Sequence, residues 1–191
     1  MDGKPFLETH KKPMSAVVEG LTHSQGSIAL ISVMLAGFAF QGFTTQDFDY
    51  DELPSGYLKS VYVLFSITTS LTIASFLFVA VSCSMLEQNG LVARSLAISY
   101  DAHPDFDVSL KEWYMTPWFA SFRRNLIYLF TSSFFTFSLF VALFCVLKLP
   151  SVIGEICGAI FLVMGSVIVA SVVRNNKHFV RGVLLKSKAK V

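Results

Sequence analysis

The chain has 191 residues, of which 53% are hydrophobic and only 15% are charged, and its formal net charge is +2. An ordinary soluble domain has about 25% charged residues, so this composition argues against a water-soluble globular protein and predicts that lipid surrounds most of the chain. So small a net charge also argues against the strongly basic surface that binds nucleic acid.

Four apolar runs follow a polar beginning. Residues 1–26 lack the apolar core of a signal peptide, so we interpret them as a cytoplasmic N-terminal segment. A helix needs about 20 residues to cross a hydrocarbon layer of ~30 Å. The runs that meet this length are residues 27–46, 57–86, 125–149 and 151–173.

The segments between and after these runs complete the predicted organisation. Residues 87–124 begin with an amphipathic pattern that continues the second helix into the cytoplasm, and a Leu-Pro-Ser connection joins the third and fourth runs as an antiparallel hairpin. Residues 174–191 form a basic cytoplasmic tail. We therefore predict an all-α membrane protein with one four-helix transmembrane domain at residues 27–173.

Lys and Arg residues are distributed unequally between the two sides of this arrangement. The side that holds both termini and the 87–124 connection carries almost all of them, and the opposite side keeps only Lys59 and Lys148. The positive-inside rule then places both termini in the cytoplasm. The bilayer is thus the first expected partner, and the membrane could be the plasma membrane or that of an organelle.

One stripe of the first run changes from apolar to polar along its length. At about 100° per residue, its members share one helix face. They are Leu30, Met34, Phe38, Gln41 and Thr45. In a symmetric ring of such helices this stripe predicts a hydrophobic constriction followed by a polar zone.

An acidic cluster follows the polar end of the stripe. Its members are Asp47, Asp49, Asp51 and Glu52. At the mouth of a ring they would form an outer vestibule that concentrates cations. The alternative is that Gln41 makes a hydrogen bond inside a helix bundle and the acids form a solvated turn.

Small residues and thiols lie within the later runs. Gly154, Gly158 and Gly165 are spaced by four and seven residues, as the face of a closely packed membrane helix requires. The cysteines, which are Cys83, Cys145 and Cys157, lie where a partner thiol would have to come from a neighbouring helix, so we interpret them as buried thiols rather than a disulfide framework.

Three segments resemble the Orai family of store-operated calcium channels. FSITTSLTIASFLFVAVSCSML, Phe65 to Leu86, resembles the second transmembrane segment of that family. ALISVMLAGFA, Ala29 to Ala39, is similar to the first, pore-lining segment of the family. VALFCVLKLP, Val141 to Pro150, is similar to the end of its third segment. The resemblance implies a homo-oligomeric ring, a hexamer in the family, with the first span innermost. It also implies that this ring lies in the plasma membrane.

The sequence departs from the family pattern at the positions that matter most for ion selection. The resemblance places Thr45 where the family carries its selectivity glutamate, Gln41 at an apolar constriction and Leu30 at a basic position. Hydroxyl groups bind a divalent cation more weakly than carboxylates do. High calcium selectivity is therefore not expected.

Two functions remain open from the sequence. The first is a pore-forming, Orai-like cation channel subunit that is gated through a cytoplasmic partner. The second is a non-conducting four-helix scaffold or accessory subunit of a larger membrane complex. No nucleophile and base pair, phosphate-cradling loop or metal-ligand spacing is apparent, so neither enzymatic activity nor a cofactor is expected.

Overall fold

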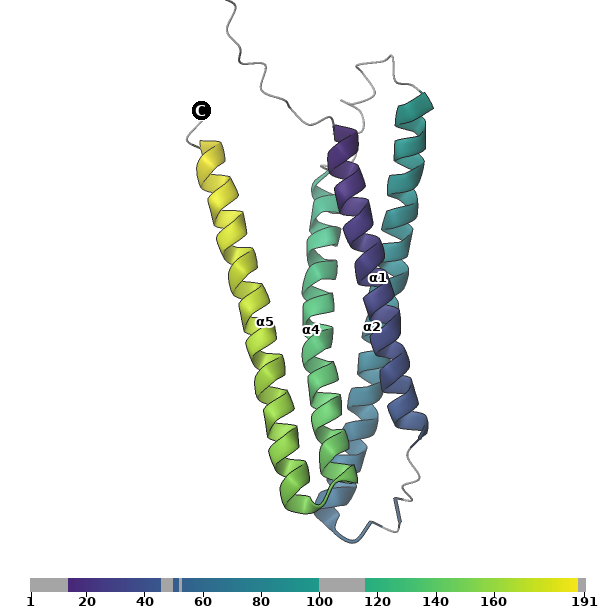
Figure 1. The fold of residues 1–191 in the computed structure, drawn as a ribbon, viewed down its shortest axis with the longest axis vertical. Helices are drawn as coiled ribbons and strands as arrows, with labels where there is room; N and C mark the ends of the chain where they lie inside the picture. The colour runs from purple at the N-terminus through teal and green to yellow at the C-terminus, as the bar shows by residue number, and fades with distance from the viewer. Residues whose placement is uncertain (1–13, 46–49, 52, 100–115, 189–191) are drawn as a thin grey trace, which may run out of the picture. The chain divides into compact units, whose positions relative to one another are not determined.

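The computed structural model describes residues 14–45, 50–51, 53–99 and 116–188 of the chain (Figure 1). All regular secondary structure within these residues is helical. The helices are α1, Met14–Thr44; α2, Gly56–Ser99; α4, Pro117–Lys148; and α5, Ser151–Lys188.

Polar residues and prolines define where the helices start. Ser55 precedes α2, and its hydroxyl accepts a hydrogen bond of 3.2 Å from the backbone N–H of Leu58, which satisfies a donor of the first turn. Pro117 is the first residue of α4, where the missing N–H costs no helical hydrogen bond. The carbonyl of Thr116 accepts the first backbone bond of this helix, from Ala120, at 3.0 Å.

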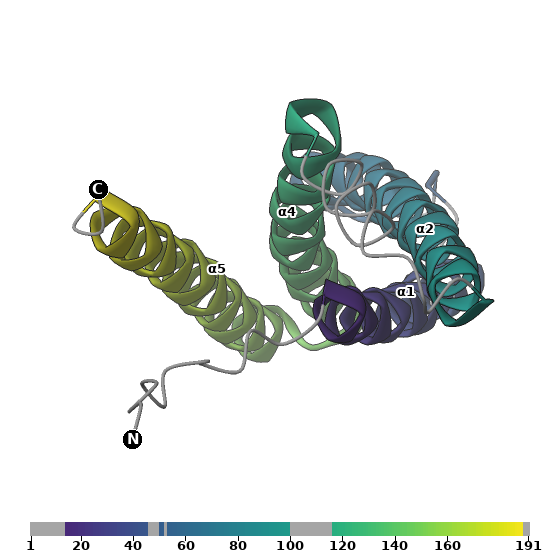
Figure 2. The ribbon, with the colours of Figure 1, turned by 90° about the horizontal axis from the view of Figure 1, so that it is seen from above.

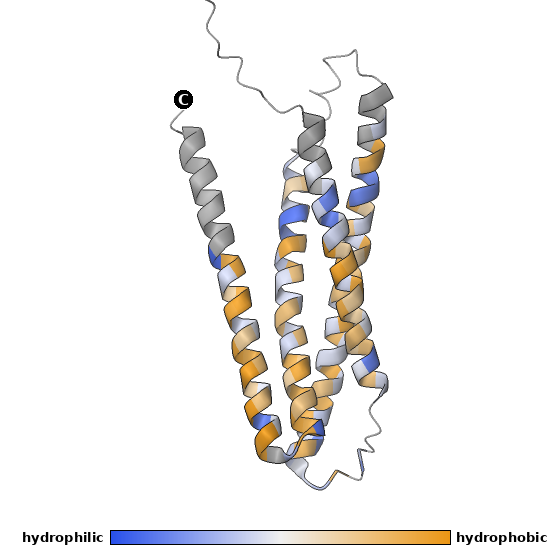
Figure 3. Ribbon diagram, in the orientation of Figure 1, coloured by the Kyte–Doolittle hydropathy of each residue, from blue (hydrophilic) through white to orange (hydrophobic). Residues whose placement is uncertain are grey.

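Each helix contains a segment that is long and apolar enough to cross a membrane. These segments are Thr22–Thr44, Gly56–Val92, Pro117–Lys148 and Val152–Arg174. Figure 3 shows hydrophobic residues along the middle of the four helices. The four predicted spans are thus confirmed by length and composition.

The helices extend beyond the spans that hydropathy predicts. Helix α1 begins at Met14, although the first apolar run starts at residue 27. Helix α2 continues to Ser99, so the predicted continuation of the second helix beyond residue 86 is confirmed, and α5 runs on to Lys188 through the basic tail. Hydropathy detects only the portion in lipid, whereas a helix continues through polar sequence until a breaking residue or a turn ends it.

The chain divides into two compact units, each built from parts of several helices. The first combines residues 1–31 with residues 80–126, and the second combines residues 32–79 with residues 127–191. Parts of α1, α2 and α4 belong to each unit, whereas α5 belongs only to the second.

Two buried phenylalanines of α2 organise the second unit. Phe65 is fully buried and stacks on Phe140 of α4, with ring centroids 5.4 Å apart. Phe76 is also fully buried, and its edge-to-face contacts are with three rings of α4: Phe130, Phe134 and Phe137. These aromatic contacts join α2 to α4.

Hydroxyl groups are buried between the phenylalanines without leaving unpaired donors. Thr69 donates to the carbonyl of Phe65 and Thr72 to that of Thr68, each at 2.7 Å. On α4, Ser133 donates to the carbonyl of Leu129 at 2.8 Å. A hydroxyl that bonds the preceding turn of its own helix can be buried in an apolar core at little cost.

Helix α5 returns antiparallel to α4 after a short turn, as the Leu-Pro-Ser connection predicts (Figure 1). Within the second unit, α5 lies on the side of α4 away from α2 (Figure 2). Only 11% of the most apolar window of α5 is buried in the chain. Most of its surface is therefore available to lipid or to another protein.

Candidate functional site

The predicted pore-lining stripe lies on the exposed surface of α1. In the second unit Met34 and Phe38 expose 54% and 55% of their surface, and Gln41 and Thr45 are exposed as well. Leu30, which belongs to the first unit, exposes 64%. None of these side chains is needed to fill the core of its own unit.

A different face of α1 makes the contacts within the second unit. Ser32, Ala36 and Ala39 recur at intervals of four and three residues, and each is at most 3% exposed. Small side chains allow helix backbones to approach closely, which is the usual packing mode between membrane helices. In the second unit α1 therefore packs through small residues and leaves its larger residues and Gln41 outside.

Two glycines of α1 differ in their surroundings. A Cβ added to Gly42 would lie 2.8 Å from Cζ of Phe140, so close packing within the unit explains this glycine. A Cβ added to Gly37 would meet nothing within 4 Å. Gly37 lies beside Phe38 and Gln41 on the exposed surface, and a glycine in a helix interior costs about 0.5–1 kcal/mol relative to alanine. Packing within the described chain does not explain it.

The polar end of the stripe is ordered by hydrogen bonds to its own helix. Thr45 donates its hydroxyl hydrogen to the carbonyl of Gln41 at 2.9 Å, and Thr44 donates to the carbonyl of Phe40 at 3.1 Å. A hydroxyl whose hydrogen is engaged in this way keeps its oxygen lone pairs for another donor or for a cation. The oxygen of Thr45 is therefore a candidate ligand of modest strength.

Asp51 is the one acid of the predicted vestibule that the structure describes, and it lies exposed in a turn. Asp47, Asp49 and Glu52 lie outside the described residues. Tyr50, beside Asp51, packs against Tyr62 of α2 with ring centroids 6.2 Å apart.

A lysine side chain, which the sequence analysis did not assign to this site, contacts the same turn. Lys59 of α2 places Nζ 5.1 Å from the centroid of the Tyr50 ring, a cation–π distance. Its positive charge lies at the turn that holds Tyr50 and Asp51, where it opposes the field of any nearby carboxylate. The sequence held one signal for this contact. Tyr50 lies among the acidic residues, and Lys59 follows it in the first turn of the next span.

The three glycines predicted to pack the fourth span all lie against α4. A Cβ on Gly154 would lie 2.6 Å from the carbonyl oxygen of Cys145, and one on Gly158 would lie 3.0 Å from that of Ala142. A Cβ on Gly165 would collide with the side chain of Ser138. Together the three glycines form the face of α5 that contacts α4.

In the first unit two polar side chains lie against glycines of the facing helix, at a place that the sequence analysis did not single out. The carboxylate of Glu87 on α2 lies against Gly26 of α1, where an added Cβ would come within 2.5 Å of Oε1. Thr22 of α1 lies in the same way against Gly90 of α2. A glycine that interrupts a long helical pattern often has a packing reason, and this was the available signal.

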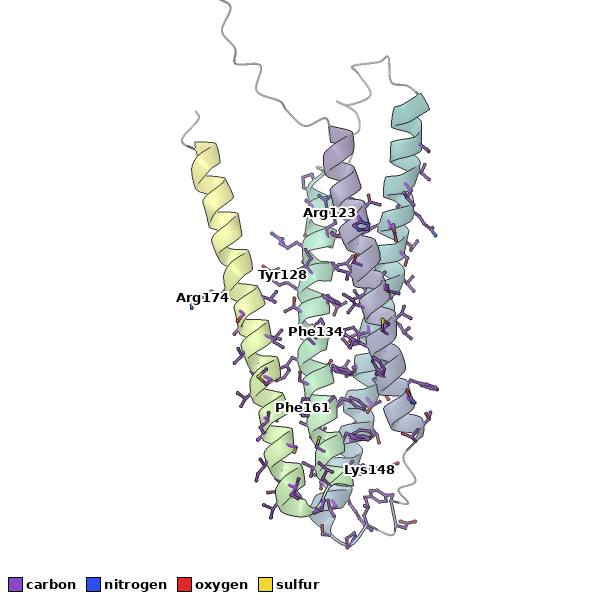
Figure 4. All side chains as sticks on the ribbon, viewed as in Figure 1. Arg123, Tyr128, Phe134, Lys148, Phe161 and Arg174 are labelled. Atoms are coloured by element: carbon purple, nitrogen blue, oxygen red, sulfur yellow. The ribbon has the colours of Figure 1, made fainter. Side chains whose placement is uncertain are left out.

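Basic and acidic residues lie near the ends of the later spans. Figure 4 labels Arg123 near the start of α4, Lys148 at its end and Arg174 in α5. Glu155, to which the sequence analysis gave no role, is exposed about one turn inside α5. In the described part of the chain no group of three His, Cys, Asp or Glu side chains is arranged to hold a metal ion.

Comparisons with known proteins found no match to a family model, to a curated protein or to a solved structure. The class of protein therefore follows from the fold itself. Four apolar helices of spanning length make the chain a multi-pass, all-helical membrane protein.

Proposed function

We propose that the chain is the pore-forming subunit of an Orai-like cation channel in which α1 lines the pore. The observation that carries the proposal is the division of α1 into a buried face of small residues and an exposed face that bears Gln41 and Thr45. Exposed polar groups in a membrane helix are stabilised when they face water or other polar groups. At the axis of a ring of identical α1 helices, these polar groups would face both water and the polar groups of the other copies.

The environment of Gly37 also supports assembly around α1. Because no atom of the described chain explains this glycine, a second copy is the partner that would make its small size useful. The resemblance of Ala29 to Ala39 to the first segment of the Orai family, together with the small-Gly-Phe-Ala pattern, favours the same arrangement. We propose a homo-oligomer, a hexamer by that resemblance, with cytoplasmic termini and a cytoplasmic gating partner.

The proposed pore has little capacity to select calcium. Its polar zone offers the amide of Gln41 and the hydroxyl of Thr45, and both are weaker ligands for a hard divalent cation than a carboxylate. We therefore propose a cation pathway in which the outer acids raise the local cation concentration without strong discrimination between ions.

One observation favours the second candidate, a non-conducting scaffold or accessory subunit. Thr44 and Thr45 both donate to carbonyls of their own helix, which makes them tolerable in lipid without any aqueous path. The large apolar surface of α5 would then be an attachment surface for other subunits of a complex.

Reconstitution of the purified full chain in planar bilayers separates the two candidates. We expect a cation current from the wild type and its loss in Gln41→Leu, because the added apolar surface lengthens the dry constriction. Phe40→Leu is the matched control, since Phe40 is 58% exposed on another side of α1 and its replacement removes no polar group. A pure, folded wild-type protein without conductance would favour the scaffold.

A further inference from the structure

Two of the three cysteines of the chain belong to the α4–α5 hairpin. Cys145 is three residues before the end of α4 at Lys148, and Cys157 is six residues after the start of α5 at Ser151. Both are free thiols with side chains that are partly buried rather than enclosed. The third, Cys83, is buried in the first unit.

The backbones of α4 and α5 are in direct contact at this level. A Cβ on Gly154 would lie 2.6 Å from the carbonyl oxygen of Cys145 and 3.1 Å from Cα of Val146. One turn further, a Cβ on Gly158 would lie 3.5 Å from Cγ2 of Val146. Helix axes are usually 8–10 Å apart. Glycine contacts of this kind bring the axes closer and so shorten the Cα–Cα distances across the contact, and a disulfide requires a Cα–Cα distance of about 4.4–6.8 Å.

Helix geometry places the two thiols on the same side of this contact. Cys145 immediately precedes Val146, and Cys157 immediately precedes Gly158, so each is turned by about 100° in the same sense from a residue at the contact. In an antiparallel pair of facing helices, equal rotations in the same sense bring both side chains to one flank.

We propose that Cys145 and Cys157 form a redox-sensitive dithiol whose oxidation to an intrachain disulfide links α4 to α5. The oxidant is a small disulfide. One cysteine thiolate attacks it, forms a mixed disulfide and releases a thiolate, and the second cysteine thiolate then displaces the remaining half. In sum two cysteine S–H groups lose two protons and two electrons, one S–S bond forms in the protein, and one small disulfide is reduced to two thiols.

The disulfide would hold α5, which is the least buried of the described helices. Helix α5 has few buried residues, and its fully packed positions within the described chain are the three glycines against α4. A covalent bond next to Gly154 and Gly158 would fix the two helices near the turn of the hairpin against sliding or separation. The inference does not depend on whether the chain conducts ions.

The test uses the full wild-type chain in detergent with bis(2-hydroxyethyl) disulfide as the probe. After oxidation the protein is denatured, its free thiols are blocked with N-ethylmaleimide, and the adducts are counted by intact mass. Because the chain has three cysteines, we expect three adducts before oxidation and one afterwards. Peptide mapping without reductant should recover the bond between Cys145 and Cys157.

Single substitutions give matched controls. Cys157→Ser and Cys145→Ser should each form no intrachain bond, because the remaining hairpin thiol can only stay free or hold a mixed disulfide with half of the probe, whereas Cys83→Ser should lose both of its thiols to the bond between Cys145 and Cys157. Retention of three adducts by the wild type, or a mixed disulfide that persists at one cysteine, would overturn the proposal. A covalent dimer that is absent in Cys157→Ser would also overturn it, because the thiols would then pair between copies.

Discussion

Gly158 of α5 faces the carbonyl oxygen of Ala142 on α4 so closely that an added Cβ would lie only 3.0 Å from it. The neighbour is backbone, which cannot rotate away as a side chain can. Any side chain at Gly158 would therefore need the backbone of α4 to move by a few tenths of an ångström, and a large side chain would need more. The first prediction follows from this contact.

Gly158→Leu should lower the thermal stability of the protein in detergent, since the helices must move apart and lose dispersion contacts. Overpacking costs about 1–3 kcal/mol in well-packed cores. Lipid or detergent is as apolar as leucine, so the new side chain brings no compensating hydrophobic gain. Ala159→Leu is the matched control, because Ala159 is the exposed neighbour. Equal melting temperatures for the two variants would refute the role of the glycine face.

Phe76→Ala should lower the stability of the second unit more than the same substitution at an exposed phenylalanine. Phe76 makes three edge-to-face contacts with rings of α4, at centroid distances of 5.9–6.3 Å. At about 0.5–1.5 kcal/mol for each aromatic pair, the loss of the three contacts should cost roughly 1.5–4.5 kcal/mol. Phe78→Ala, at a position 54% exposed, should change stability little. Thermal unfolding followed by near-ultraviolet circular dichroism measures both variants.

Much of this architecture could be predicted from the sequence because hydropathy reports directly on the length of apolar helix. The four spans and the short hairpin follow from it. The contact faces do not, because an almost wholly apolar span such as Val152–Arg174 of α5 has no polar side to orient it. Spacing of small residues indicated Gly154, Gly158 and Gly165, whereas the contact of Glu87 with Gly26 depends on the relative register of α1 and α2.

The candidate site was accessible to sequence reasoning only in part. The stripe through Met34, Phe38 and Gln41 could be placed on one face from helical periodicity alone. Its exposure depends on which other face packs, and Ser32, Ala36 and Ala39 provide that face. The cation–π contact of Lys59 with Tyr50 joins a loop to a helix, and no periodic pattern predicts such a contact.

The predicted topology can be tested with Asp51→Cys, placed in the exposed turn before α2, in a chain whose native cysteines are replaced by serine. A membrane-impermeant maleimide should label this thiol only from the face opposite the termini, as the Lys and Arg asymmetry predicts. Ser95→Cys, exposed near the other end of α2, should be labelled only from the cytoplasmic face. Labelling of both variants from one side would contradict the arrangement.

The acidic cluster is expected to act through its electrostatic field if the chain forms a channel. Replacing Asp47, Asp49, Asp51 and Glu52 together with Asn or Gln should lower cation conductance mainly at low ionic strength. Such a field is screened over about 8 Å at physiological salt, so the effect should shrink as salt rises. Lys59→Gln should change conductance in the opposite direction, because it removes the cation beside Tyr50. A loss of conductance that is equal at all salt concentrations would place the acids inside the narrow path instead.

Thr45→Glu tests the selectivity of the proposed pore at its polar end. In the wild type the Thr45 hydroxyl hydrogen is engaged by the carbonyl of Gln41, which leaves only a neutral oxygen for a cation. A ring of carboxylates at this position would supply charged oxygen ligands, which Ca²⁺ prefers, and should shift the reversal potential towards calcium in mixtures with monovalent ions. Thr45→Gln, which adds length without charge, is the control and should leave the reversal potential unchanged. A conducting Thr45→Glu protein with wild-type selectivity would show that this residue does not face the ion path.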